Sequence, residues 1–113
     1  MNALSSEALA QALSGDPAPL LLDVRRAAAR NQSGRQIAGA EWRDPALWLE
    51  WKDGVAARGR LCPVVLYCAH GQEISQALTT ALQVLGARAV FLEGGYAAWT
   101  NAGGVCEPLP PAG

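Results

Sequence analysis

Residues 61–75, LCPVVLYCAHGQEIS, run a short apolar segment into a cysteine and then into a small loop. Pro63 to Tyr67 is a continuous apolar run, which is typical of a strand buried on both faces of a parallel sheet. After the loop, apolar residues recur at the spacing of one helix face and Gly86 supplies a stop; they are Ile74, Ala77, Leu78, Ala81, Leu82 and Leu85. The segment therefore predicts a central strand, a loop and a helix.

Cys68 lies where the predicted strand meets the loop. In open α/β sheets, ligands bind at the carboxyl ends of the strands. Free backbone N–H groups and the positive end of the helix dipole would favour a sulfur anion there and lower the pKa of the thiol. Gly71 lets the loop backbone approach closely. The alternative is a buried, inert cysteine, because free cysteine is among the most buried residue types. Position alone does not separate these two readings.

Four segments, in the same order along the chain, resemble signatures of the rhodanese-like sulfurtransferase family. They are LLDVR at 21–25, IAGA at 37–40, VLYCAHG at 65–71 and LEGGYAAW at 92–99, the last being similar to the family's Leu-Glu-Gly-Gly-x-x-x-Trp element. The resemblance extends from about residue 20 to about residue 104. It implies a three-layer α/β/α fold with a mostly parallel central sheet. It also implies that Cys68 is the catalytic nucleophile, which accepts a sulfane sulfur as a persulfide and passes it to a thiophilic acceptor.

The loop departs from the family pattern at its last residue. Rhodaneses commonly carry a six-residue loop that begins with the catalytic cysteine and ends with arginine, whereas Glu73 ends this loop. A carboxylate there would repel an anionic donor such as thiosulfate, so weak thiosulfate activity is expected. Glu73 could instead point outward and complement the helix dipole, the role we prefer, or pair with a cation, for which Arg43 is the candidate. The resemblance implies that the loop binds substrate and persulfide through Ala69, His70, Gly71, Gln72 and Glu73.

Four other polar roles are expected near this site. His70 could donate a hydrogen bond to a bound anion or protonate an outgoing thiolate, although a solvent-facing loop residue is the simpler interpretation. Ser75 could reach the sulfur, but a serine in a first helical turn more often bonds the backbone. Asp23 and Arg25 are expected to support the site as a buried ion pair or loop clamp.

The rest of the chain alternates between helix and strand patterns, which indicates an α/β architecture. One rhodanese-like domain is expected over residues 1–113, with a core of about residues 4–106 and a Pro-rich tail at 107–113 that lacks periodicity. The remaining predicted elements are a short helix capped by Ser5 and ended by Gly15, a strand at 20–24, a loop or short helical turn at 26–34, a helix from Asp44-Pro45 through Trp51, a strand at 89–92 and a helix at 95–101.

Composition excludes several classes of function. A formal net charge of -1 over 113 residues provides no basic surface for nucleic acid. No apolar run approaches the roughly 20 residues that span a bilayer, and the first residues lack a signal-peptide pattern. The cysteines at 62, 68 and 106 lack the short paired spacing of zinc sites, and an odd number suits a reducing cytoplasm. We expect no metal, no cofactor and no membrane partner, and no feature specifies an oligomeric state.

The function that these patterns favour is sulfur transfer. A thiosulfate or a small-molecule or protein-bound persulfide would donate sulfur to Cys68, and a thiol or cyanide would accept it. The alternative is a catalytically weak or inactive rhodanese-like module that binds or regulates, which the missing loop arginine supports. A phosphatase or arsenate reductase would need a longer loop that closes in arginine, and Ile74 occupies that place.

Overall fold

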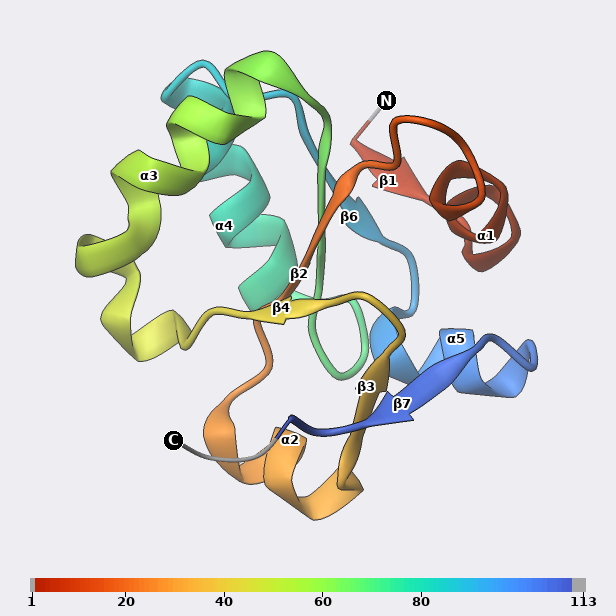
Figure 1. The fold of residues 1–113 in the computed structure, drawn as a ribbon. Helices are drawn as coiled ribbons and strands as arrows, with labels where there is room; N and C mark the ends of the chain where they lie inside the picture. Colours follow the sequence, from red (N-terminus) through yellow and green to blue (C-terminus); the bar gives the residue numbers. More distant parts are fainter. Residues whose placement is uncertain (1, 111–113) are drawn as a thin grey trace.

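The computed structural model describes residues 2–110, and a five-stranded parallel sheet lies at their centre (Figure 1). The strand order is β1-β6-β5-β2-β4. The apolar run of the opening segment forms β5 (Val64–Tyr67) in the middle of the sheet, between β2 (Leu20–Asp23) and β6 (Ala89–Leu92). The edges are the two-residue strands β1 (Ala3–Leu4) and β4 (Glu41–Trp42), neither of which the sequence predicted.

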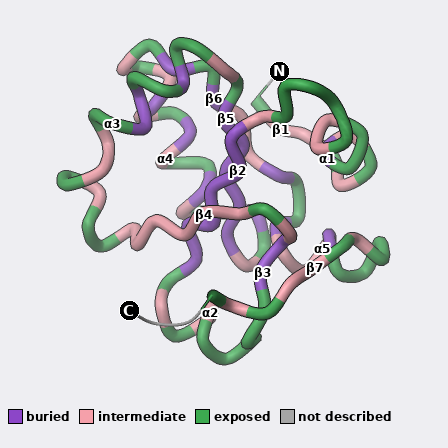
Figure 2. Tube along the Cα trace, in the orientation of Figure 1, coloured by how far each residue is buried: buried purple, intermediate pink, exposed green. Residues whose placement is uncertain are grey.

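Helices cover both faces of the sheet, which confirms the predicted three-layer α/β/α fold. On one face α3 (Trp48–Leu61) and α4 (Glu73–Val84) pack over Leu22 and Leu66. On the other face α1 (Ser6–Leu13) and α5 (Gly95–Asn101) pack over Leu21 and Val65. Successive strand residues point to opposite faces, so two covered faces require a continuous apolar run. Figure 2 shows the buried residues concentrated along β2, β5 and β6.

A second, antiparallel sheet pairs β3 (Arg35–Ile37) with β7 (Cys106–Pro108), and α2 (Ala27–Ser33) precedes it. The prediction of an irregular tail at 107–113 is therefore wrong for residues 107 and 108, which belong to β7. The carboxylate of Glu107 accepts hydrogen bonds from the Gln36 side chain at 2.9 Å and from the backbone N–H of Gly39 at 3.0 Å. These partners are distant along the chain and leave no local pattern. Residues 111–113 of the predicted tail lie outside the described residues.

The helix predicted from Asp44 through Trp51 is longer than expected. It begins as a 3-10 turn, η1 (Pro45–Leu47), in which the Asp44 carboxylate accepts a hydrogen bond from the Ala46 N–H at 2.9 Å, and α3 then continues to Leu61. The sequence did not predict this longer helix, because Gly59 disfavours a helix. The structure requires a glycine at this position, where α3 meets the turn before β6. A Cβ at Gly59 would lie 2.6 Å from Cβ of Ala87. Trp48 and Trp51 pack edge to face, with ring centroids 4.8 Å apart.

The buried face of α4 agrees only in part with the predicted one. Its buried residues are Ser75, Thr79 and Leu82, whereas Ala77 is exposed. The predicted residues Ile74, Leu78 and Leu85 are partly buried and pack against the core around Leu82, so the apolar spacing located most of this face and missed the two members that carry hydroxyl groups. The predicted cap of α1 is confirmed, since the hydroxyl of Ser5 accepts a hydrogen bond from the backbone N–H of Ala8 at 3.1 Å.

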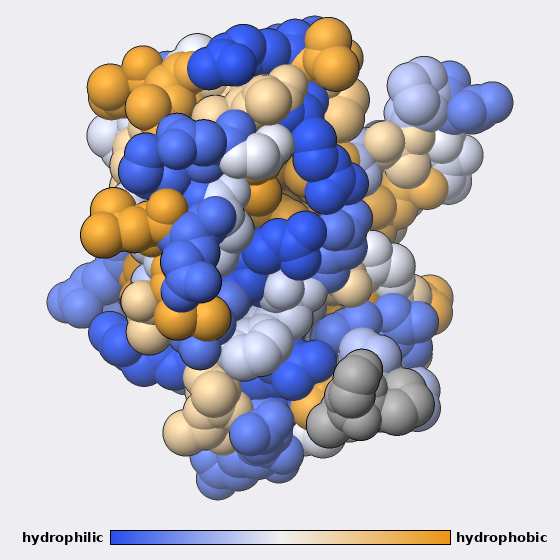
Figure 3. Space-filling model, turned by 60° about the vertical axis from the view of Figure 1, so that its left-hand side comes forward, coloured by the Kyte–Doolittle hydropathy of each residue, from blue (hydrophilic) through white to orange (hydrophobic). Residues whose placement is uncertain are grey.

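The face of the molecule that carries α3 is mixed in polarity. Figure 3 shows its apolar side chains in several small groups separated by hydrophilic ones. The large apolar residues that η1 and α3 expose are Leu47, Leu49 and Leu61. Within residues 2–110, no helix has the length and apolar character needed to cross a membrane.

Candidate functional site

Cys68 follows β5 directly, at the carboxyl edge of the sheet, and is 6% exposed. The loop after it leads to Glu73, the first residue of α4. A hollow of about 370 Å³ opens beside the thiol and is lined by Arg25, Arg26, Ala29, Cys68, Ala69, His70, Gln72, Glu73 and Ile74. A larger hollow, of about 780 Å³, lies between α1 and the end of α5 and includes none of the loop. Of these two hollows, the smaller one combines a cysteine thiol with charged side chains of both signs, so it is the candidate active site.

The first turn of α5 holds the loop in place. The backbone N–H of Tyr96 donates to the carbonyl of Cys68 at 2.9 Å, and that of Ala97 donates to the carbonyl of Ala69 at 3.0 Å. The side-chain amide of Gln76 donates to the carbonyl of Gly71 at 2.9 Å. These contacts hold three loop carbonyls in place.

Ser75 completes the surroundings of the sulfur. Its hydroxyl oxygen lies 3.1 Å from Sγ of Cys68, and its side chain is fully buried. Our preferred prediction, that Ser75 serves the backbone, is wrong. Ser75 lies on the face of α4 that packs against the sheet. Its hydroxyl therefore points toward Cys68 at the end of β5 and not toward the backbone of its own helix turn.

These contacts favour the thiolate. Burial of Cys68 disfavours the anion, but hydrogen bonds from the Ser75 hydroxyl and from the backbone N–H groups of Ser75, Gln72 and Gly71 outweigh burial and lower the pKa of the thiol below its ordinary value. A lower pKa increases the thiolate fraction near neutral pH, and the thiolate is the nucleophilic form.

Ser75→Ala is expected to make Cys68 less reactive near neutral pH. Loss of one net hydrogen bond, worth roughly 0.5–1.4 kcal/mol, raises the pKa of the thiol and slows alkylation about two- to tenfold. The pH dependence of iodoacetamide alkylation measures this shift, which should move the midpoint to higher pH. Thr79→Val is the matched control, because Thr79 is buried one turn further along α4 and its hydroxyl has no hydrogen-bond partner. An unchanged midpoint in Ser75→Ala would contradict the assigned contact.

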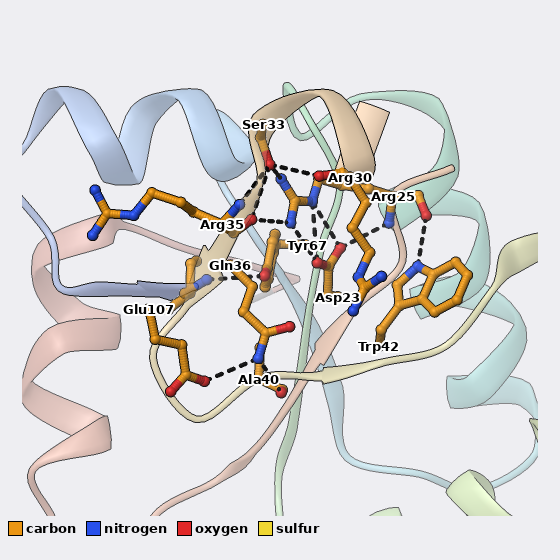
Figure 4. A network of polar contacts seen from close by, with 11 residues as sticks. Asp23, Arg25, Arg30, Ser33, Arg35, Gln36, Ala40, Trp42, Tyr67 and Glu107 are labelled. Atoms are coloured by element: carbon orange, nitrogen blue, oxygen red, sulfur yellow. Dashed lines mark hydrogen bonds and ion pairs between the residues drawn. The ribbon is translucent and has the colours of Figure 1, made fainter. Parts of the chain in front are cut away.

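Asp23 and Arg25 form the predicted buried ion pair (Figure 4). Nη2 of Arg25 lies 2.7 Å from Oδ2 of Asp23, and the two side chains are 1% and 0% exposed. The guanidinium also donates to the hydroxyl of Ser33 at 3.0 Å and to the carbonyl of Arg35 at 2.7 Å, and it lies 4.3 Å from the ring centroid of Tyr96. Arg25 lines the hollow, but each of its three guanidinium nitrogens already donates to a group within the protein.

Arg43 does not pair with Glu73, so that prediction is wrong. Nη2 of Arg43 lies 3.0 Å from Oε1 of Glu41, and Arg58 binds the other carboxylate oxygen of Glu41 at 3.0 Å. The reason is topological, because β4 leads Arg43 toward α3 and away from the loop. Glu73 is exposed, as the outward role requires, and yet its side chain still lines the hollow. His70 is exposed at the same opening.

Comparison with known proteins agrees with this geometry. The sequence profile of the rhodanese-like domain family matches residues 5–102. The chain belongs to the rhodanese-like domain family. A comparison with curated protein sequences finds no match.

Solved structures share this rhodanese-like fold. A rhodanese-related protein from Thermoplasma volcanium has a TM-score of 0.77 and 25% identity, with 95% of this chain and 98% of that chain covered. A protein of unknown function from Rhodopseudomonas palustris CGA009, described as a possible tyrosine phosphatase, has a TM-score of 0.80 and 24% identity over 95% of this chain and 85% of that chain. The thiosulfate sulfurtransferase from Pseudomonas aeruginosa has a TM-score of 0.76 and 26% identity, and the match covers 95% of this chain but 19% of that longer chain.

Arg26 and Ala29 contribute to the hollow of this rhodanese-like domain although the sequence did not identify them. They lie at the start of α2, directly after the Asp-Val-Arg segment. That position next to Arg25 was the sequence signal that could have placed them at the site. The other cysteines lie elsewhere, since Cys62 ends α3 and Cys106 belongs to β7. Among residues 2–110, no group of three or more His, Cys, Asp or Glu side chains is placed to hold a metal ion.

Proposed function

We propose that this rhodanese-like domain is a sulfurtransferase that carries sulfane sulfur as a persulfide on Cys68. The observation that supports the proposal is the combination of a thiol with a lowered pKa and an open hollow beside it. A buried structural cysteine needs neither a set of hydrogen bonds to its anion nor access to solvent.

The proposed reaction has two transfers. The Cys68 thiolate attacks the outer sulfur of the donor; a new S–S bond forms at Sγ while the donor's S–S bond breaks, and the electron pair leaves with sulfite or with a thiolate. A thiol or cyanide acceptor then attacks the outer sulfur of the persulfide and releases the Cys68 thiolate. The N–H groups of Gly71 and Gln72 stabilise the anionic sulfur through both steps. The residues of the chain suffice for this chemistry without a metal or an organic cofactor.

Thiosulfate is proposed to be a poor donor. Glu73 lines the hollow, where its carboxylate offsets the attraction of Arg26 for a dianion, and the buried guanidinium of Arg25 is committed to Asp23. Persulfides carry less charge and are the preferred donors on this argument. We further propose that the reaction takes place in the cytoplasm. The three cysteines of the protein are free, and a reducing compartment keeps cysteines in the thiol form.

Intact-mass spectrometry tests the proposed function. The reduced protein is exposed to thiosulfate and, separately, to a persulfide donor. We expect a mass gain of one sulfur atom, larger with the persulfide and absent in Cys68→Ser. Cys62→Ser is the matched control and should keep the gain, because Cys62 lies away from the hollow. If the native protein gains no sulfur from either donor, the domain is a binding or regulatory module instead.

A further inference from the structure

We propose that the opening of the Cys68 hollow selects a zwitterionic donor, an α-amino-acid hydropersulfide such as that of cysteine, through the opposed charges of Arg26 and Glu73. The inference rests on the proposed sulfur transfer and concerns which donor the site prefers. Its basis is the placement of one cation and one carboxylate at the rim of the hollow that holds the nucleophile.

Arg26 and Glu73 come from different elements. Arg26 directly precedes α2, and Glu73 is the first residue of α4. Both side chains are exposed, and both line the Cys68 hollow and an adjoining one of about 290 Å³. Throughout residues 2–110, neither side chain takes part in an ion pair. Their charges are therefore available to a ligand.

The other ionisable groups of the hollow leave this pair as the main charges at the rim. Arg25 is neutralised by Asp23 at 2.7 Å, so it adds little net attraction for an anion. His70 lies at the same opening and is exposed. A small dianion meets both Arg26 and the opposing carboxylate of Glu73, so attraction and repulsion largely cancel. A zwitterion can place its carboxylate near Arg26 and its ammonium near Glu73, so that both contacts are favourable.

The size of the hollow agrees with such a donor. A volume of about 370 Å³ falls within the range of small-molecule sites, roughly 300–1,000 Å³. The partly buried side chains of Ala29 and Ile74 line it beside the charged pair and provide apolar surface for the donor's methylene group.

The transfer from this donor is balanced. The Cys68 thiolate attacks the outer sulfur of R–S–SH, and the Sγ–S bond forms as the S–S bond of the donor breaks. The electron pair leaves on the amino-acid thiolate, which takes up a proton from solvent. The proton of the outer sulfur stays on the new Cys68 hydropersulfide, so no oxidant or reductant is required.

The test compares four donors on the full chain, with sulfur loading of Cys68 followed by intact mass. The donors are cysteine hydropersulfide, its N-acetyl analogue without the ammonium, its ethyl ester without the carboxylate, and thiosulfate. The native protein should load from cysteine hydropersulfide about two- to fivefold faster than from either blocked analogue, the range of an exposed ion pair. Glu73→Gln should remove only the preference for a free ammonium, and Arg26→Gln only the preference for a free carboxylate. Glu73→Arg should raise loading from thiosulfate.

Two controls change the same charges elsewhere. The control variants are Asp53→Asn and Arg88→Gln. Asp53 lies on α3 and Arg88 lies before β6, and both residues are exposed and absent from the lining of either hollow. Both controls should keep the native donor preferences. Equal loading from all three hydropersulfides, or variants that change all donors alike, would overturn the zwitterion proposal and leave sulfur transfer intact. Failure of every donor to load the native protein would instead overturn the proposed function.

Discussion

Asp23→Asn is expected to lower the free energy of unfolding by about 3–5 kcal/mol, because it leaves the guanidinium of Arg25 buried without a counter-charge. Arg25 is 2% exposed and its Nη2 lies 2.7 Å from the carboxylate of Asp23. The remaining acceptors of the guanidinium, the Ser33 hydroxyl and the Arg35 carbonyl, are neutral. Asparagine has nearly the same size as aspartate, so the loss reports the charge and not a cavity.

Chemical denaturation measures this effect. The matched control is Glu41→Gln, because Glu41 also pairs with arginine but its side chain is 39% exposed, and an exposed pair contributes at most about 1 kcal/mol. In Asp23→Asn/Arg25→Met, both charges are gone, and much of the lost stability should return. If Asp23→Asn is no more destabilising than Glu41→Gln, the buried pair does not stabilise the fold as argued.

Gly95→Ala is expected to cut the rate of sulfur loading by more than about tenfold and to destabilise the fold as well. Gly95 has a φ of +60°, and a Cβ there would lie 2.6 Å from the backbone N of Gly71 and against the carbonyl oxygen of Cys68. The clash would push the loop after Cys68 away from α5. The N–H groups that lower the pKa of the Cys68 thiol would then lose their alignment with the sulfur.

Gly34→Ala separates the clash from backbone strain. Gly34 has a similar φ of +68°, but no atom lies within 4 Å of its Cβ position. Each alanine carries the strain of the left-handed conformation, roughly 1–2 kcal/mol, whereas only Gly95→Ala should also lose sulfur loading. Denaturation midpoints and loading rates, measured on both variants, distinguish the two effects. Similar losses of loading in the two variants would show that close contact at Gly95 does not position the loop.

The centre of the fold was predictable because its signals are local and strong. Residues 63–67 are apolar at successive positions, and this strand and the helix after it appear as β5 and α4 within one or two residues. The helix at 95–101 and the cap at Ser5 were also predicted correctly. Each of these elements is specified by its own residues or by its immediate neighbours.

The elements that sequence reasoning missed depend on distant partners. β1 and β4 have two residues each, and β7 forms only because β3 lies beside it. At the site, the position of Cys68 could be predicted from the strand that precedes it. The sequence raised the contact between Ser75 and the sulfur as one of two alternatives but could not decide between them, because the choice depends on the rotation of α4. The separation of Arg43 from Glu73 could not be predicted, because it depends on the direction of β4 in three dimensions.

The dependence of the loop on α5 has a consequence for biosynthesis. The carbonyls of Cys68 and Ala69 are held by N–H groups of Tyr96 and Ala97, almost thirty residues later in the chain. A growing polypeptide that has emerged only as far as β6 carries Cys68 without the N–H groups that hold its loop. We therefore expect the pKa of the Cys68 thiol to be lowered only in a chain in which α5 has formed and docked against the loop, and this order would limit disulfide exchange at Cys68 during synthesis.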